Sequence, residues 1–424
     1  MVPPPSSILI DDLTRPVLTE AQQGVLRYAE SEEIDLDPAS LQRDAAVLSG
    51  LDAPDFEGGD PSFWARFAAY VGVVEADGGL NNLGRMIQRT RVTRLLSSRA
   101  LLNDLLARFP EIREIQIVKP LIVVGLPRSG TTHLVNLLAA DPRRRALPYW
   151  ESQEPFPKRG QAPGADGLDP RYLRIKAEHE AELQLAPLTQ NMHDRFPEAI
   201  EEECEVMDLD FCSYTLEWHA RVPGWRDYYL DLDQDQHYAY LHTVLQALTF
   251  LRGPNRWVLK CPQHFENLSP LIRTFPDATV AFTHRDPVAV IQSAITMLAY
   301  GDRMRRAEIA PAELRDYWID RVERLLRSAI RDRDLVPADQ SIDVLFHEFM
   351  ADDMAVVDKL FAVAGEPMPE RVRQKILGYL QANPRGKHGQ IRYDLAGDFG
   401  VTAEELHPRF EFYRERFGVT KEKA

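Results

Sequence analysis

The sequence is poor in cysteine and in long apolar segments. It has three cysteines, Cys204, Cys212 and Cys261, and no C-x-x-C pair. We therefore expect structural cysteines, with no disulfide framework and no metal site. No apolar run approaches the roughly 20 residues of a membrane span, and the first residues lack the pattern of a signal peptide. These absences predict a cytoplasmic protein without a transmembrane segment.

The chain also lacks the positive charge that proteins use to bind nucleic acids. Its 65 acidic and 50 basic residues give a formal net charge of −15 at pH 7. Affinity for a phosphate backbone depends on many lysine and arginine contacts, so we expect no nucleic-acid partner. A small anionic ligand is still compatible with this charge, provided that arginines and helix N-termini gather locally.

Strand and helix patterns divide the chain into two regions. Residues 18–108 place apolar side chains mostly at helical spacing, so residues 1–115 are predicted to form a helical N-terminal region. Within residues 116–424, helical segments alternate with short apolar runs, which predicts a parallel sheet flanked by helices. The predicted strands are Leu121 to Val124, Arg256 to Lys260, Ala278 to His284 and Ser341 to Glu348.

A glycine-rich loop follows the first predicted strand but lacks the lysine of a Walker A loop. In VVGLPRSGTTHL, Gly125 and Gly130 keep the Walker spacing, whereas Thr131 stands at the lysine position and Thr132 follows it. The backbone amides of such a loop, together with a helix N-terminus, can cradle an anion without that lysine. The threonine hydroxyls would add donors, and Arg128 would bring a positive charge into the same space.

The sequence GLPRSGTT resembles the 5′-phosphosulfate loop of sulfotransferases that use 3′-phosphoadenosine 5′-phosphosulfate (PAPS). In that family, a second motif binds the ribose 3′-phosphate through an arginine and a serine eight residues later. THRDPVAVIQSAITM supplies Arg285 and Ser293 at this spacing. The resemblance covers about residues 120–400, points to the bacterial branch of the superfamily and implies a P-loop-NTPase-like α/β fold. The residues that it places around PAPS in the first loop are Arg128, Ser129, Gly130, Thr131 and Thr132.

A segment near the C-terminus, NPRGKHGQIRYDLAGDFGVT, is similar to the basic segment that closes over the 3′-phosphate in cytosolic members of the family. Its candidates for that contact are Arg385 and Lys387, and a solvated basic loop without a ligand is the alternative. The resemblance also accounts for the missing Walker lysine, because PAPS has no β,γ-phosphate bridge for it to grip. None of the motifs requires a metal ion.

The resemblance implies transfer of the sulfuryl group from PAPS to a hydroxyl of a small or lipid-like alcohol or phenol, with release of adenosine 3′,5′-bisphosphate (PAP). Arg128 and Lys260 are the candidates for stabilising charge during the transfer. His264 is the first candidate for the general base, because a helix start would favour a neutral imidazole there. The family has its lysine two residues before the catalytic histidine, whereas four residues separate Lys260 from His264.

Several alternatives stay open at this level. The segment QNMHDRFPEAIEEECEVMDLDF offers His193, Glu201 or Glu202 as the base, or is simply the solvated face of a helix. Two other functions also fit the motifs: an ATP-dependent small-molecule kinase and a non-catalytic PAP-binding protein. The sequence defines neither the acceptor nor the oligomeric state.

Overall fold

The structure, a computed structural model, describes residues 7–193, 195–387 and 389–422. Its centre is a four-stranded parallel sheet in the order β3-β2-β4-β5. The strands are β2 (Leu121–Gly125), β3 (Val258–Lys260), β4 (Thr279–His284) and β5 (Ser341–Leu345). Because all four are parallel, their carboxyl ends meet at one edge of the sheet. The predicted parallel sheet flanked by helices is confirmed.

The ends of the strands differ from the prediction by one to three residues, and most at the end of β5. The predicted strand Ser341 to Glu348 stops at Leu345, and Phe346 begins helix α16 (Phe346–Ala351). A short apolar run fits the strand and the helix periods equally well, so the sequence does not locate this boundary. The structure also contains a second, two-stranded parallel sheet that was not predicted, in which β1 (Ser7–Leu9) pairs with β6 (Gln390–Arg392).

Alternate residues of the central sheet pack into two different apolar cores. Along β2, Leu121 and Val123 face the core on one side, which is built by α5 (Thr131–Ala139), α17 (Asp353–Val363) and α18 (Glu370–Ala382). Ile122 and Val124 face a larger core on the other side, which includes side chains of the N-terminal helices. Every residue of β2 is buried. A strand covered on both faces must be apolar throughout, which is why its sequence is a continuous apolar run.

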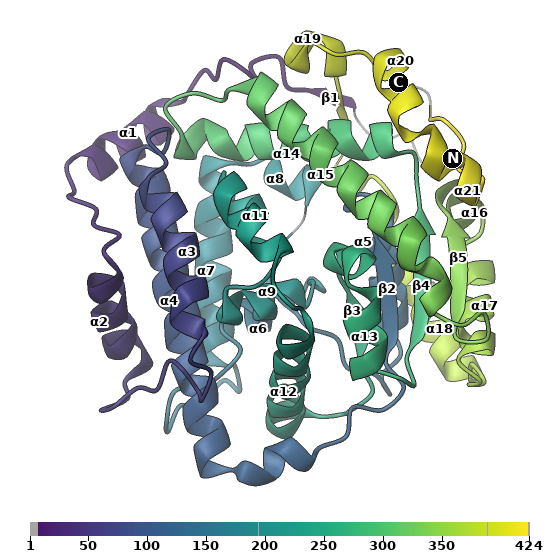
Figure 1. The fold of residues 1–424 in the computed structure, drawn as a ribbon, viewed down its shortest axis with the longest axis horizontal. Coiled ribbons are helices and arrows are strands. Elements are labelled where there is room, and N and C mark those ends of the chain that lie inside the picture. The colour runs from purple at the N-terminus through teal and green to yellow at the C-terminus, as the bar shows by residue number, and fades with distance from the viewer. Residues whose placement is uncertain (1–6, 194, 388, 423–424) are drawn as a thin grey trace.

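The predicted helical N-terminal region is present. Figure 1 shows it in purple and blue on the left, with the sheet on the right. Phe67 and Leu96 of this region belong to the same apolar core as Val124 of the sheet. Sharing one core neither supports nor contradicts a domain boundary at residue 115, so this boundary stays a prediction. The helices are α1 (Glu20–Glu30), α2 (Pro38–Ser49), α3 (Phe63–Glu75) and α4 (Asn82–Arg108).

The other helices connect and cover the strands (Figure 1). Those before β3 are α5 (Thr131–Ala139), α6 (Tyr149–Gln153), α7 (Pro170–Leu185), α8 (Thr189–Met192), α9 (Cys204–Met207), α10 (Leu216–His219), α11 (Pro223–Leu230) and α12 (Asp235–Arg252). Those after β3, besides α16, are α13 (Leu268–Thr274), α14 (Pro287–Arg305), α15 (Pro311–Asp332), α17 (Asp353–Val363), α18 (Glu370–Ala382), α19 (Leu395–Phe399), α20 (Ala403–Leu406) and α21 (Glu411–Phe417). Within the described part of the chain, no helix combines the length and apolarity needed to cross a lipid bilayer.

Candidate active site

A cavity of about 250 Å³ lies beside the loop that follows β2. The carboxyl edge of a parallel sheet, next to the loop between a strand and a helix, is the usual place for a ligand site in such folds. Arginines and glutamates from distant parts of the chain meet in this cavity. Its charged and hydroxyl-bearing residues are Arg128, Thr131, Thr132, His193, Arg195, Glu201, Glu202, Glu205, Thr215 and Arg285.

Close packing holds the loop after β2 in one conformation. A Cβ atom on Gly125 would lie 1.9 Å from the Thr283 hydroxyl on β4, so glycine is required there. The Ser129 hydroxyl donates to the Leu126 carbonyl at 2.6 Å and lies 2.7 Å from the Thr283 hydroxyl. Ser129 is buried and does not line the cavity. It therefore braces the loop from behind, while its neighbours face the cavity.

Helix α5 begins at this loop, and its first residues line the cavity. Gly130 precedes the helix with a φ of 89°, and no side chain among the described residues caps the first amides. Thr131 and Thr132 present their side chains next to these amides. The first amides of a helix lack intrahelical partners and carry partial positive charge. This helix end can therefore bind a phosphate or sulfate group.

Two motifs that are far apart in the sequence meet beside this helix end. The Arg128 Nε donates to the Ser293 hydroxyl at 3.0 Å, and Arg285 donates to the Arg128 carbonyl at 2.5 Å. Asp286 caps a helix, α14 (Pro287–Arg305), that carries Ser293 at the end of its second turn. Arg128 and Arg285 line the cavity, whereas Ser293 is buried behind them. The chain as a whole carries a net negative charge, so these two guanidinium groups supply positive charge locally.

Lys260 lies just behind the first residues of α5. Its ammonium group donates to the Thr132 hydroxyl at 3.4 Å and forms a short ion pair with Glu202. Burial alone would lower the pKa of Lys260, but Glu202 and Glu201 raise it above its usual value. Lys260 therefore stays positively charged next to the cavity, although it does not line the cavity itself.

His264 lies outside the cavity. It is fully buried in a 3-10 turn, Pro262–Glu266, which lies just before helix α13 (Leu268–Thr274). Its Nε2 lies 2.7 Å from Glu203, and its Nδ1 lies 2.7 Å from the Tyr238 hydroxyl. Both ring nitrogens therefore have protein partners, and neither faces the cavity residues.

His193, by contrast, lines the cavity and is held by a carboxylate. Its Nε2 lies 2.8 Å from an oxygen of Glu201. Burial alone would raise the pKa of Glu201, but His193, Lys260 and Arg195 together bring it below its usual value. An ionised carboxylate fixes the tautomer and the orientation of a histidine ring, as it does in enzymes where histidine is the general base.

The two basic candidates near the C-terminus, Arg385 and Lys387, do not reach the cavity. Arg385 forms a short ion pair with Asp353 on α17, and the Lys387 ammonium donates to the Asn383 side chain at 3.1 Å. Neither residue lines the cavity. The resemblance assigned these two residues to the 3′-phosphate, whereas their partners here are Asp353 and, within the same segment, Asn383.

Several residues at or beside the cavity were not among the predicted site residues. The Tyr393 hydroxyl lies 2.8 Å from the Ser293 hydroxyl, which is 100 positions away in the sequence. Trp218 and Met297 line the cavity wall. Aromatic and methionine side chains at such positions look like ordinary core residues, so only the folded chain reveals where they lie.

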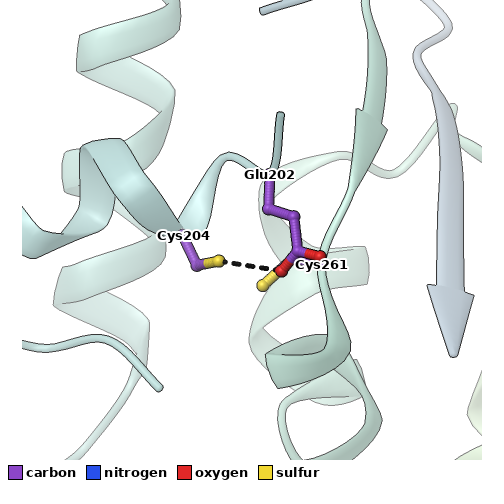
Figure 2. Close-up of side chains that lie close together, drawn as sticks. All are labelled: Glu202, Cys204 and Cys261. Carbon is purple, nitrogen blue, oxygen red and sulfur yellow. Dashed lines mark hydrogen bonds between the residues drawn. The ribbon is translucent and has the colours of Figure 1, made fainter. Parts of the chain in front are cut away.

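Glu202 also contacts two cysteines, Cys204 and Cys261, as Figure 2 shows. The Cys204 thiol donates to Glu202 at 3.3 Å, and potential ligand atoms of the three residues lie within 4.8 Å of one another. Burial raises the pKa of both thiols, and Glu202 already pairs with Lys260. Soft metal ions bind thiolates and not thiols, so these contacts favour a packing role for the two cysteines.

Comparisons with known proteins identify a family and similar folds. A family model described as the sulfotransferase family matches residues 120–370, more than half of the chain. The solved structure of sulfotransferase STF9 from Mycobacterium avium is similar in fold, with a TM-score of 0.80, 23% identity and coverage of 93% of this chain and 100% of that chain. Sulfotransferase STF1 from Mycobacterium tuberculosis H37Rv gives a TM-score of 0.77 at 26% identity, with coverage of 89% and 99%. A comparison with curated proteins gave no match.

Proposed function

Because the chain belongs to the sulfotransferase family, we propose that it transfers the sulfuryl group from PAPS to the hydroxyl of an alcohol or phenol and releases PAP. The observation that carries this proposal is the meeting of Arg128 and Arg285 at the uncapped start of α5, beside one cavity. A helix end and two guanidinium groups suit a ligand with two separate anionic groups. PAPS has its phosphosulfate at one end and its 3′-phosphate on the ribose.

In this proposal the residues divide between the two anionic groups of PAPS. The amides at Gly130, Thr131 and Thr132 hold the 5′-phosphosulfate, with the two threonine hydroxyls as further donors. Arg285 binds the 3′-phosphate through its guanidinium fork, and Ser293 assists it. Ser129 acts indirectly, by bracing the loop. We assign no contact to Arg385 and Lys387, because their protein partners hold them away from the cavity.

The charges near the helix end suit the transfer step. Sulfuryl transfer, like phosphoryl transfer, is expected to pass through a loose transition state, in which charge develops on the equatorial and leaving oxygens. The guanidinium group of Arg128 acts there by charge and hydrogen bonding. Lys260 adds a second positive charge from behind Thr132.

We propose His193 as the general base that accepts the proton of the acceptor hydroxyl. The supporting observations are its place on the cavity wall and its contact with Glu201, because a base must come within hydrogen-bond reach of the proton that it removes. His264 instead takes a structural role. It holds Glu203, whose other oxygen accepts a hydrogen bond from the Lys260 amide at 2.6 Å, at the end of β3.

The proposal is tested by incubating the protein with PAPS and a panel of alcohols and phenols, followed by mass spectrometry of the products. We expect PAP and one sulfate ester in equal amounts. Bound PAP without a sulfate ester from any member of the panel would favour a non-catalytic PAP-binding protein. A phosphate ester formed from ATP and Mg²⁺ under the same conditions would favour a kinase.

A further inference from the structure

A second and larger cavity, of about 530 Å³, adjoins the first. It lies between α4, α7 and α14. The two cavities share several lining residues, so they meet at a common wall instead of lying on separate faces. The shared residues are His193, Arg195, Glu205, Trp218 and Met297. The histidine proposed as the base therefore stands where the two cavities join.

The wall of this larger cavity is mainly apolar. Helix α4 contributes Leu83, Met86 and Ile87, and α14 contributes Leu298 and Met304. Ile87 is 40% exposed, although it is a large apolar side chain. Exposed apolar surface that lines a concavity commonly marks a binding site, because an apolar ligand gains free energy by covering it.

Several of the charged residues in this cavity are already paired. Arg94 donates to both carboxylate oxygens of Glu178, at 2.7 and 2.8 Å. Arg91 donates to Glu205 at 3.2 Å and forms a short ion pair with Asp208. These pairs neutralise Arg94 and Arg91 from within the protein. Most of the surface left in the wall is hydrocarbon, although His179, Glu182 and Arg195 also line it.

We infer that this cavity holds the hydrocarbon body of the sulfuryl acceptor, and that the acceptor is an alcohol or phenol carrying a bulky or long apolar group. This inference rests on the proposed function. A cavity of about 530 Å³ has the size of sites that enclose molecules as large as typical drugs. A sugar or a short polar alcohol would leave the apolar wall uncovered.

The position of the cavity defines the geometry of the transfer. The acceptor enters through the larger cavity and presents its hydroxyl at His193. A bond forms between the hydroxyl oxygen and sulfur. The bond between sulfur and the phosphate oxygen of PAPS breaks, and its electron pair stays with that oxygen. His193 takes the hydroxyl proton, so the products are a sulfate ester, PAP and a protonated histidine.

Helix α4 lies outside the segment that the family model matches, and this leads to a specific expectation about the acceptor. Leu83, Met86 and Ile87 precede the segment that the family model matches, residues 120–370. The donor site is thus built from the family segment, whereas part of the acceptor wall comes from the N-terminal helices. Changes in α4 should alter the choice of acceptor without altering the affinity for PAP.

The test compares 1-octanol, 1-butanol and glucose as acceptors with PAPS, in the wild-type protein and in the Ile87→Glu variant. Val47→Glu is the matched control, because Val47 is 82% exposed on α2 and lines neither cavity. In the wild type we expect the KM for 1-octanol to be at least about 100-fold lower than that for 1-butanol, because it buries four more methylene groups. Ile87→Glu should raise the KM for 1-octanol at least about tenfold, and by a larger factor than the KM for 1-butanol, with PAP affinity unchanged.

The other possible outcomes distinguish a failure of the acceptor assignment from a failure of the proposed function. If PAP binds but the KM does not fall with chain length, or glucose is the best acceptor, the apolar acceptor is excluded and sulfuryl transfer is retained. The same conclusion follows if Ile87→Glu behaves like Val47→Glu. If calorimetry detects no PAP binding to the wild type, the proposed function fails and the acceptor assignment fails with it.

Discussion

Arg285 and Glu422 form a two-point ion pair beside the cavity. The Nε and Nη2 atoms of Arg285 donate to the two carboxylate oxygens of Glu422, at 2.6 and 2.7 Å. The Glu422 amide donates to Asp286 at 2.9 Å, which anchors this end of the described chain. A carboxylate bound in this way uses the same guanidinium fork that would bind a phosphate. Glu422 thus occupies the donors that we assign to the 3′-phosphate of PAPS.

The Glu422→Gln variant should bind PAP more tightly than the wild type, because the phosphate no longer competes with a carboxylate for Arg285. The pair is partly exposed, so we expect a modest decrease in Kd, about two- to fivefold by calorimetry. Glu415→Gln on α21 is the control, since Glu415 is exposed, and it should leave the Kd unchanged. Weaker binding by Glu422→Gln would show that Glu422 does not compete with the ligand.

Replacing the two candidate bases separately should give opposite results. His193→Asn should lower kcat by at least about 100-fold and leave PAP affinity intact, because it removes the proton acceptor on the cavity wall. His264→Asn should lower the Tm, because it disturbs buried contacts with Glu203 and Tyr238, while the folded variant keeps most of its turnover. Stopped-flow or steady-state kinetics with PAPS measure both variants. The reverse pattern would return the role of base to His264.

Gly125→Ala should destabilise the protein and weaken PAP binding. The added Cβ would meet the Thr283 hydroxyl at 1.9 Å, so β2 and β4 would have to separate or the loop would have to shift. Overpacking of this kind typically costs about 1–3 kcal/mol. Gly378→Ala on α18 is the matched control, because a Cβ there meets nothing within 4 Å. Equal Tm values for the two variants in thermal denaturation would contradict the close packing at Gly125.

His219 should make the stability of the protein depend on pH. Burial, followed by the charge of Arg91, lowers its pKa from 6.5 to about 3 in the folded chain. The unfolded chain therefore binds more protons between these values, and the free energy of unfolding falls as the pH falls through that range. From pH 7 to about pH 5 this group should remove about 2 kcal/mol of stability.

His219→Gln should abolish that part of the pH dependence. The check is the change in Tm between pH 7 and about pH 5, which should be smaller for His219→Gln than for the wild type. His347→Gln is the control, because His347 is exposed on α16, and it should retain the wild-type change. An unaltered pH dependence in His219→Gln would mean that His219 is not held neutral in the folded chain.

The local parts of the site were predictable from the sequence. Two motifs depend only on residues that are close in the chain: the loop between Gly125 and Thr132, and the spacing of Arg285 and Ser293. Both can therefore be recognised without a structure. The sheet was predictable for the same reason, because a strand buried on both faces must be apolar throughout. The pairing of β1 with β6 was not, since it joins three-residue strands from opposite ends of the chain.

The choice between candidate bases depends on contacts between residues far apart in the sequence, which a local sequence pattern does not reveal. His264 meets Glu203 across 61 positions, and this contact keeps one of its nitrogens engaged inside the protein. The role of α4 in lining the larger cavity was not predictable for the same reason, since Ile87 looks like any apolar residue of an amphipathic helix. The partner of Arg385 was not predictable for the same reason, because Asp353 lies 32 positions away in the sequence.

Calorimetric titration with PAP, and separately with ATP plus Mg²⁺, tests the central claim most directly. We predict tight binding of PAP and weak binding of ATP. In Arg285→Ala, PAP affinity should be about 10- to 100-fold lower with an unchanged Tm, because charge-assisted hydrogen bonds to the phosphate are lost. Binding of ATP without binding of PAP, or an Arg285→Ala variant with wild-type PAP affinity, would contradict the assignment of a PAPS site.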